Sequence, residues 1–393
     1  MDAVGIIGTG ISGLHLALYL QAAGVPTTVY APRPLGEHPS SPLPNTVVRW
    51  APTLARECEL GIDLPAAPAL RAMHIRVAGT PVDFSGTLPA PADATDFRMH
   101  LPRLAGAYQE RGGNLVIEAC GAADLERLSR SHELVVVAAG RDGFGGAFPR
   151  DHDRSPHPAP RRHLTVGLYR GVTWPDPAGV EMTLVPGGGE IFHIPFMSFG
   201  GPVSGLSVEA IPGGPLDVLE RVPVADLPGR MLGLLERFAP ELRARIEPGS
   251  FALTRPIDML QGRLTPVVRR VWTGLPCTRN VLAIGDAWIT NDPIAAQGAN
   301  LGSRSAFLLG ELIVNARSHD EIFRHTVEDR LWAAAQAPTA ISNALLEPPS
   351  PHVLDLLGRA VGDQHLADQL CDFGDPEGML ELFAPPVSAP ALL

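Results

Sequence analysis

Three glycines early in the chain have the spacing needed to bind an anion. Gly8, Gly10 and Gly13 follow an apolar run at residues 4–7 and precede an apolar helical pattern. In this spacing the first glycine makes a tight turn, the second lets the backbone approach a pyrophosphate, and the third lets the helix pack on the strand. The N–H groups of the first helical turn, which includes Ser12, lie at the positive end of the helix dipole and would hold the anion. The stretch therefore predicts a dinucleotide site.

The acidic residue that normally binds the ribose in such a site is missing. Residues 27–30 are expected to form the second strand, and Ala31 and Pro32 follow where Asp or Glu is typical. Glu37 and backbone groups remain as candidates for the ribose. Arg33 is expected near the pyrophosphate side of such a fold.

A second stretch with binding potential lies far along the chain. Gly285 and Asp286 end an apolar strand, and a long helix is opened by Gly298. A carboxylate at a strand end can bind the hydroxyls of a ribityl chain, and the positive end of the helix would stabilise an anionic reduced flavin. A flavin enzyme needs this distant second half, whereas a nicotinamide dehydrogenase does not. The predicted contacts here are Gly285, Asp286, Pro293, Gln297, Gly298, Ala299 and Asn300. Taken alone, Gly285-Asp286 would be an ordinary strand-end turn.

Two kinds of strand would position these motifs. Apolar runs at residues 134–140 and 281–286 predict a buried parallel sheet. Four short strands between residues 164 and 210, separated by Gly and Pro, predict an antiparallel sheet, and residues 74–84 predict a hairpin. Helices are expected at 50–62, 97–111, 214–222, 226–245 and 301–316, and in the segment after residue 320, where a break is expected near Pro348–Pro351.

Composition excludes several classes of protein. The 393 residues are 45% hydrophobic and carry a net charge of −11, which argues for a compact fold and against binding to nucleic acid or an anionic membrane surface. The four cysteines are scattered without a CxxC pair, which is typical of a reducing compartment, so we expect a cytoplasmic protein. The first apolar run is interpreted as a βα unit rather than a signal peptide, and no run is long enough to span a membrane.

Several catalytic signatures are absent from the sequence. It contains no GxSxG, HExxH or P-loop pattern, so it offers no hydrolase, metalloprotease or kinase motif. His152, His157 and His163 fall in a loop rich in Gly, Pro and Arg, but their spacing matches no ligand pattern. We therefore predict no metal site.

The order of the motifs resembles the styrene and indole monooxygenases, which are oxygenase components of two-component FAD monooxygenases. The resemblance covers nearly the whole chain, and its most specific part runs from Asp258 to Asn300. It is carried by Gly8–His15, Leu43–Val47, Asp96–Arg98, Gly189–Phe199, Ile257–Gly262 and Gly285–Asn300.

This resemblance implies a mechanism. A separate NADH-dependent flavin reductase supplies reduced FAD, which diffuses to this chain and reacts with O2. The resulting flavin C4a-hydroperoxide transfers oxygen to a small hydrophobic aromatic substrate, an aromatic alkene or indole, in an epoxidation, and sulfides are further candidates. The homodimer often seen in similar enzymes is an expectation from the resemblance alone.

The resemblance also implies an α/β fold of the hydroxybenzoate-hydroxylase type. A Rossmann-like FAD domain with a parallel sheet would comprise residues 1–70, 96–163 and 270–320. An antiparallel substrate domain would comprise residues 71–95 and 164–269, and residues 321–393 would form a C-terminal helical segment.

Residue roles follow from the same resemblance. Asn45 matches the family's active-site asparagine, and with Thr46 it would hold the peroxide or its water; the alternative is an Asn that caps a loop. Arg98 would contact the flavin or its pyrophosphate, or else form a surface ion pair. His74 matches a histidine near the flavin pocket, or is structural.

The chain departs from the family's pattern at a few positions. Pro42 stands where the family often has an arginine, and Pro44 replaces an aliphatic residue before the active-site asparagine; Trp288 is also unusual. The resemblance therefore supports the class of reaction more firmly than it supports styrene as the substrate.

Two other interpretations of the function remain open from the sequence. A single-component aromatic hydroxylase would take hydride from NAD(P)H, but the Asp142-Gly143 pair follows a strand directly, in a different place from the motif of those enzymes. The second of these interpretations is a flavin-binding protein without turnover. The long antiparallel region argues instead for a substrate pocket.

Overall fold

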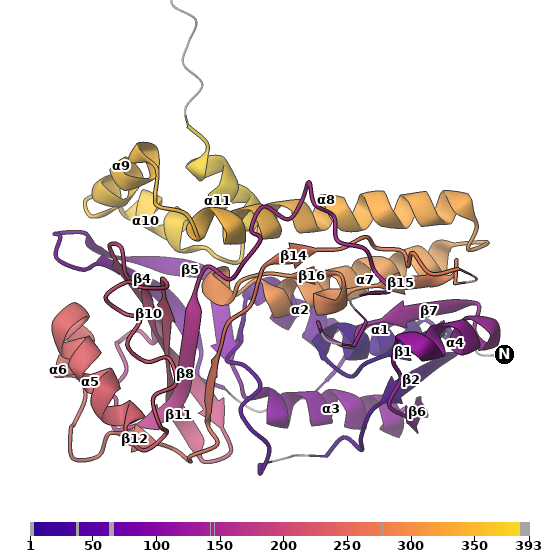
Figure 1. The fold of residues 1–393 in the computed structure, drawn as a ribbon, viewed down its shortest axis with the longest axis horizontal. Helices are drawn as coiled ribbons and strands as arrows, with labels where there is room; N and C mark the ends of the chain where they lie inside the picture. The colour runs from indigo at the N-terminus through magenta and orange to yellow at the C-terminus, as the bar shows by residue number, and fades with distance from the viewer. Residues whose placement is uncertain are drawn as a thin grey trace, which may run out of the picture.

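The computed structural model describes residues 4–36, 39–62, 67–141, 143–144, 146–276 and 278–385. Two sheets lie side by side in Figure 1, and the C-terminal helices lie across the top of both. Glu37 and Asp142, which the sequence raised as a ribose contact and as part of a hydroxylase-like motif, fall outside the described residues. The α/β fold with a parallel sheet, an antiparallel-rich sheet and C-terminal helices is confirmed.

The first sheet is parallel throughout, in the strand order β15-β7-β1-β2-β6. Its central strands are apolar runs with almost no solvent exposure, which is typical of a sheet covered by helices on both faces. The strands are β1 (Val4–Ile7), β2 (Thr27–Ala31), β6 (Asn114–Ile117), β7 (Leu134–Val137) and β15 (Val281–Ala283). The helices of this half are α1 (Ile11–Ala22), α2 (Ala51–Glu59), α3 (Phe97–Glu110), α4 (Leu125–Ser131) and α7 (Gly298–Asn315). Asp96 caps α3 as predicted, since its side chain accepts a hydrogen bond from the Arg98 N–H.

The second sheet has the order β12-β8-β11-β10-β9-β4-β5-β3, with β13 also paired to β8. The expected hairpin and antiparallel strands are present, but β4 joins them by running parallel to β9. Its members are β3 (Val48–Arg49), β4 (Leu70–Val77), β5 (Asp83–Ala94), β8 (His163–Arg170), β9 (Gly179–Val185), β10 (Gly189–Ser198), β11 (Gly201–Ala210), β12 (Ala252–Leu253) and β13 (Met259–Gly262). The sequence assigned residues 48–49 to the FAD domain, whereas their strand pairs in this second sheet; the domain division itself stays a prediction.

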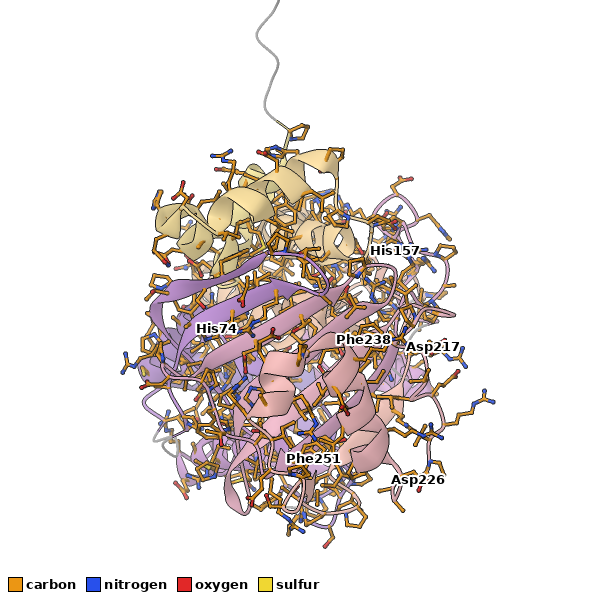
Figure 2. The ribbon with its side chains drawn as sticks, turned by 90° about the vertical axis from the view of Figure 1, so that its left-hand side faces the viewer. His74, His157, Asp217, Asp226, Phe238 and Phe251 are labelled. Atoms are coloured by element: carbon orange, nitrogen blue, oxygen red, sulfur yellow. The ribbon has the colours of Figure 1, made fainter. Side chains whose placement is uncertain are left out.

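The outer face of this sheet is covered by α5 (Leu227–Phe238) and α6 (Pro240–Ala244), and Figure 2 views the molecule from that side. The single helix predicted for residues 226–245 is wrong, because Pro240 starts a new helix after Ala239 and a proline cannot continue the hydrogen-bond ladder. The helix predicted for residues 214–222 is also wrong, since that segment forms consecutive turns.

The remaining elements connect and cover the two sheets. A short pair, β14 (Val267–Val268) and β16 (Ile289–Thr290), lies close to the single-turn helices η2 (Gly285–Ala287) and η3 (Pro293–Ala295); η1 (Ala122–Asp124) precedes α4. The C-terminal helices are α8 (Glu321–Leu345), α9 (Pro351–Ala360), α10 (Gln364–Cys371) and α11 (Pro376–Phe383), with the predicted break between α8 and α9. Among the described residues no helix is both long and apolar enough to cross a membrane.

Candidate functional site

The two distant sequence motifs meet at one edge of the parallel sheet. β1 pairs with β7, and β7 pairs with β15, all in the same direction. Their carboxyl ends therefore lead side by side into Gly8, Ala138 and Gly285. Ligands of open α/β sheets bind outside the carboxyl ends of the strands. The predicted return of the Gly285-Asp286 strand to the first sheet is confirmed.

The three glycines of the first motif have different surroundings. Gly8 has φ +113°, and a Cβ there would lie 2.4 Å from the Ala138 carbonyl oxygen. A Cβ on Gly13 would lie 2.2 Å from the carbonyl oxygen of Gly8. A Cβ on Gly10 would instead meet nothing closer than the Ala138 oxygen at 4.0 Å. Gly8 and Gly13 are thus required by packing, whereas Gly10 leaves open space, as an approaching pyrophosphate requires.

The start of α1 is free to receive an anion. Gly10 precedes the helix without a side-chain cap, and the first turn contains no acidic residue. Ser12 is buried, and its hydroxyl lies 2.5 Å from where a Cβ on Gly285 would be and 2.3 Å from one on Gly302. Glycine at these two positions lets α1, α7 and the end of β15 approach closely. Ser12 thus packs this junction, and its predicted contact to the cofactor stays a prediction.

Asp286 and Arg33 both lie beyond strand ends. Within the described residues no hydrogen bond reaches the Asp286 carboxylate, whereas the Asp286 carbonyl oxygen accepts hydrogen bonds from Arg269 and Thr290. Burial raises the pKa of Asp286, and the charges of Arg141 and Arg269 oppose that shift. Such a carboxylate is ready to accept hydrogen bonds from hydroxyls. Arg33 is exposed just after β2, and its contact stays a prediction.

Asn45 carries an unused acceptor. Its Oδ1 is buried and has no hydrogen-bond partner in the described part of the chain, so the structure provides no loop-capping bond for it. Asn45 and Thr46 are half-buried on the segment that leads into β3. That segment is tied to the first turn of α7, because Asn300 Nδ2 donates to the Val48 carbonyl oxygen at 2.9 Å. A buried orphan acceptor on a segment that is bonded to the first turn of α7 fits a bound polar group.

Arg98 is engaged inside the protein. Its Nη2 lies 2.6 Å from Asp96 Oδ2 and 2.8 Å from Asp258 Oδ1, and its Nη1 donates to the Ser41 carbonyl oxygen at 2.8 Å. Arg98 thus forms ion pairs, but they are buried, so the alternative of a surface ion pair is wrong in its location; a contact to the cofactor stays a prediction. Arg255 completes the cluster by pairing with Asp258. Together these groups hold the segment that precedes Asn45.

The polar side chains at the start of α7 also form hydrogen bonds within the protein. Gln297 Nε2 donates to the carbonyl oxygens of Ala295 and Phe373, at 3.0 and 2.7 Å. Asn300 Oδ1 accepts from the Trp50 N–H and from Thr53 Oγ1. These contacts position the helix start. Any contact of Gln297, Gly298, Ala299 or Asn300 with a flavin therefore stays a prediction, and the first turn of α7 contains no acidic residue.

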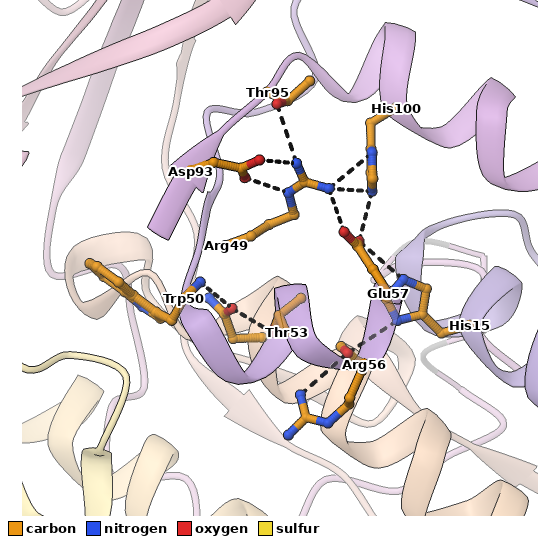
Figure 3. Close-up of polar contacts among 11 residues, drawn as sticks. His15, Arg49, Trp50, Thr53, Arg56, Glu57, Asp93, Thr95 and His100 are labelled. Carbon is orange, nitrogen blue, oxygen red and sulfur yellow. Dashed lines mark hydrogen bonds and ion pairs between the residues drawn. The ribbon is translucent and has the colours of Figure 1, made fainter. Parts of the chain in front are cut away.

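A buried ionic network anchors the elements around α1, and Figure 3 shows its contacts. Glu57 Oε2 accepts from Arg49 Nη1 at 2.7 Å, and Glu57 Oε1 lies 3.2 Å from His15 Nε2 and 2.9 Å from His100 Nε2. Arg49 also makes a two-pronged bond to Asp93. Burial alone would raise the pKa of Glu57, but hydrogen bonds from both histidines and the Arg49 charge hold it well below its usual range. Burial lowers the pKa of His100 to about 4.

Sequence reasoning missed a second buried cluster, at the end of the second sheet nearest η3. Arg162 binds Glu190 through two nitrogens, at 2.8 and 2.9 Å. Glu209 lies opposite Glu190 on β11, and its Oε2 has no partner in the described structure. Burial, with the charges of Asp292 and Glu190, raises the pKa of Glu209 well above its ordinary value, and burial raises that of Asp292 to about 6. The sequence signal that could have revealed this cluster is the presence of acidic residues at inward-facing positions of buried strands.

An apolar wall faces the same region. Phe192, Ile194 and Phe196 alternate along β10 on its inward face, and Val203 lies opposite Phe196 on β11. They belong to one buried cluster with Leu43, Ile294 and Ala295, which come from the Asn45 segment and from η3. Pro293 opens η3 behind the Asp292 cap. This wall suits an apolar substrate and would keep water away from it.

His74 and His163 are separate from this region. His74 lies on β4, where its Nδ1 is 2.5 Å from Ser85 Oγ, so the structural alternative is supported; Figure 2 shows its position on the sheet. His163 Nδ1 lies 2.7 Å from Asp217 Oδ1 and near Glu220, a grouping that could hold a cation. Arg263 also contacts this trio, through His163 Nε2 and Glu220 Oε1.

Comparison with known proteins identifies relatives of the whole chain and of its fold. Residues 140–245 match the family model described as the putative substrate-binding domain of styrene monooxygenase A. The chain is 34% identical to the styrene monooxygenase StyA of Pseudomonas fluorescens, over 98% of this chain and 95% of that protein. Among solved structures it is similar to the flavin-dependent brominase Bmp2, with 13% identity, a TM-score of 0.67 and coverage of 97% and 98% of the two chains. It is also similar to the p-nitrophenol 4-monooxygenase PnpA of Pseudomonas putida, with 14% identity, a TM-score of 0.63 and coverage of 98% and 96%.

Proposed function

Because the chain belongs to the styrene monooxygenase family of flavoprotein monooxygenases, we propose that it epoxidises a small aromatic alkene with reduced FAD supplied by a separate NADH-dependent reductase. Indole is a second substrate of the same class, and sulfides are a third. The homodimer and the cytoplasmic location remain predictions.

One observation carries this proposal. The buried acceptor of Asn45, which has no partner in the described residues, lies on a segment that is bonded to the start of α7 and whose Leu43 packs in the same cluster as the apolar wall. When bound, reduced FAD supplies the reaction with dioxygen and the electrophilic oxygen atom. The protein's task is then to bind, orient and exclude water, because an epoxidation asks little acid–base chemistry of side chains.

The residues divide this task between them. The backbone at Gly10 and the first turn of α1 would bind the pyrophosphate, and Asp286 would accept hydrogen bonds from hydroxyls of the cofactor. The side-chain amide of Asn45 would donate and accept hydrogen bonds beside the reacting oxygen, and Thr46 would assist it. Phe196 and Val203, on the apolar wall, would place the aromatic ring of the substrate.

A reconstitution without any reductase tests the proposal. Photoreduced FAD, the purified chain and styrene are mixed in oxygenated buffer, and styrene oxide and hydrogen peroxide are quantified. We expect styrene oxide in an amount that depends on the chain, with Gly10→Val as the background control. Complete conversion of the reducing equivalents to hydrogen peroxide, with no epoxide from styrene or indole, would refute the proposal.

A second measurement separates the single-component alternative. Oxidised FAD and the chain are mixed with NADH or NADPH without oxygen, and the absorbance of oxidised flavin is followed. We expect no bleaching, because a separate reductase is proposed to carry that step. Rapid bleaching by either nucleotide would favour a single-component aromatic hydroxylase. Flavin binding without any oxygenated product would favour a flavin-binding protein without turnover.

A further inference from the structure

A cavity of about 280 Å³ lies beside the start of α7, on the side covered by the C-terminal helices. Its lining comes from α2, α7, α8 and the region around the start of α11. The glycine motif, Asn45 and Asp286 do not line it. Gln297 and Asn300 do, but their side chains are already bonded to the protein. The cavity is therefore a candidate for a second ligand, separate from the flavin.

Two hydrogen-bond donors on its lining have no adequate acceptor. In the described residues the Arg56 guanidinium forms no ion pair, and its hydrogen bond to Ser303 Oγ is long, at 3.4 Å. Trp50 is 4% exposed, and its indole N–H is buried without a partner in the described chain. Figure 3 shows Trp50, Thr53 and Arg56 along α2. A buried donor without an acceptor is rare in proteins, so the Trp50 N–H points to a missing acceptor. The half-buried Arg56 guanidinium lies on the same cavity and has no carboxylate partner among the described residues.

The charges nearby decide what kind of acceptor fits. Arg304 also lines the cavity, but it is paired with Glu377 at 2.5 Å. Burial, together with the like charge of Arg304, lowers the pKa of Arg56, and the charge of Glu59 opposes this shift. Among the described residues no carboxylate is bonded directly to the Arg56 guanidinium. One uncompensated positive charge favours one negative charge, and the Glu377 carboxylate at the same cavity disfavours a dianion such as phosphate.

The cavity lining is divided between polar and apolar residues. Beyond the polar groups the ring of Trp50, the side chain of Leu301 and three prolines contribute to it: Pro52, Pro338 and Pro376. The cavity volume lies just below the usual range for small-molecule sites, roughly 300–1,000 Å³, so the ligand must be small. A ligand with a compact apolar body and a single anionic group matches both features.

We propose that this cavity binds a small organic monocarboxylate, with the carboxylate on Arg56 and the apolar body against Trp50 and Leu301. Arginine binds carboxylates through two parallel hydrogen bonds, which gives both affinity and orientation. The site requires no flavin, and its test is carried out on the protein without flavin. A negative result for the carboxylate site would therefore not contradict the proposed epoxidation. Likewise, a failure of the epoxidation test would not contradict the carboxylate site.

The test is a titration with sodium benzoate, followed through the indole N–H signals of the five tryptophans by ¹⁵N NMR. The signal lost in Trp50→Phe identifies Trp50. We expect that signal to shift saturably with benzoate and not with the neutral analogue benzamide. Arg56→Gln should weaken the binding by roughly tenfold or more, because a charge-assisted hydrogen bond is lost. Arg330→Gln, an exposed arginine of α8 that does not line this cavity, is the matched control and should bind normally.

Three results would overturn the proposal. The first is no shift of the Trp50 signal with benzoate. The second is an equal affinity in Arg56→Gln and the unchanged protein, which would mean that the guanidinium does not hold the ligand. The third is a shift of the Trp50 signal by inorganic phosphate or benzamide at the same concentrations, which would contradict a monocarboxylate site.

Discussion

Glu190 and Glu209 lie directly opposite each other on β10 and β11, yet only Glu190 is bound by Arg162. Glu209 is buried, and its Oε2 lacks a partner among the described residues. Asp292, at the start of η3, adds a third carboxyl group whose charge acts on Glu209. One arginine cannot compensate three buried carboxylates, so the cluster retains a proton near neutral pH.

This retained proton makes stability depend on pH. Burial raises the pKa of Glu209, and raises that of Asp292 to about 6. At pH values above the unfolded carboxyl pKa of about 4, the folded protein therefore binds more protons than the unfolded chain. As a result, the free energy of unfolding falls as the pH rises toward and through the pKa values of these groups in the folded protein. Glu209→Gln imitates the protonated acid, so it should be more stable than the unchanged protein at pH 8, by roughly 1–3 kcal/mol, and similar at pH 5.

Urea unfolding at pH 5 and pH 8 measures this effect. Glu236→Gln, at an exposed position of α5, is the control and should leave the pH dependence unchanged. If Glu209→Gln lost stability equally at both pH values, Glu209 would be ionised in the folded protein and this interpretation would be wrong.

Substitution of Gly10 should separate flavin binding from folding. A side chain at Gly10 meets open space, so Gly10→Val should fold with a nearly unchanged melting temperature while blocking the approach of the pyrophosphate. Gly13→Val should instead destabilise the protein by about 1–3 kcal/mol or more, because its Cβ would clash with the Gly8 carbonyl oxygen. Differential scanning calorimetry and an FAD titration of both variants check this. Normal FAD binding by Gly10→Val would contradict the nucleotide site.

Asn45→Ala should change the products rather than the fold. Its Oδ1 has no partner in the described structure, so the substitution removes no internal hydrogen bond of that atom. We expect FAD binding to persist and the reducing equivalents to appear as hydrogen peroxide instead of epoxide. The ratio of epoxide to peroxide in the reductase-free reconstitution measures this, with Asn114→Ala at the start of β6 as control. An unchanged ratio would remove Asn45 from the mechanism.

Loss of the Glu57 charge should destabilise the junction between α1, α2 and α3. Glu57 is fully buried between Arg49, His15 and His100, and its low pKa reflects those contacts. Glu57→Gln should lower the free energy of unfolding by about 3–5 kcal/mol at pH 7, because Arg49 loses a buried partner. Since the folded pKa of Glu57 is depressed, this stabilisation in the unchanged protein is present above the unfolded pKa and is lost as the pH falls.

Chemical denaturation of Glu57→Gln at pH 7 checks the size of this effect. The same substitution at Glu59, an exposed residue of α2, should change stability by less than about 0.5 kcal/mol. Equal effects at both positions would mean that the buried network contributes little to folding.

The sequence determined the features that depend on neighbours along the chain. The spacing of Gly8, Gly10 and Gly13, the apolar strands and the Asp96 cap all act within a few residues, and the structure contains them where they were predicted. The order of the motifs also identified the family, since order survives when individual side chains change.

The tertiary structure decided which side chains meet. Arg98 could have faced a cofactor, but the fold places Asp258 beside it, and Asn300 is used on Val48 and Trp50. The carboxyl groups of Glu209 and Asp292 lie in separate elements, and only the docking of the second sheet on η3 brings them together in a buried space. Local sequence fixes backbone conformation, whereas the partner and the protonation of a buried polar group depend on distant elements that exclude water from it.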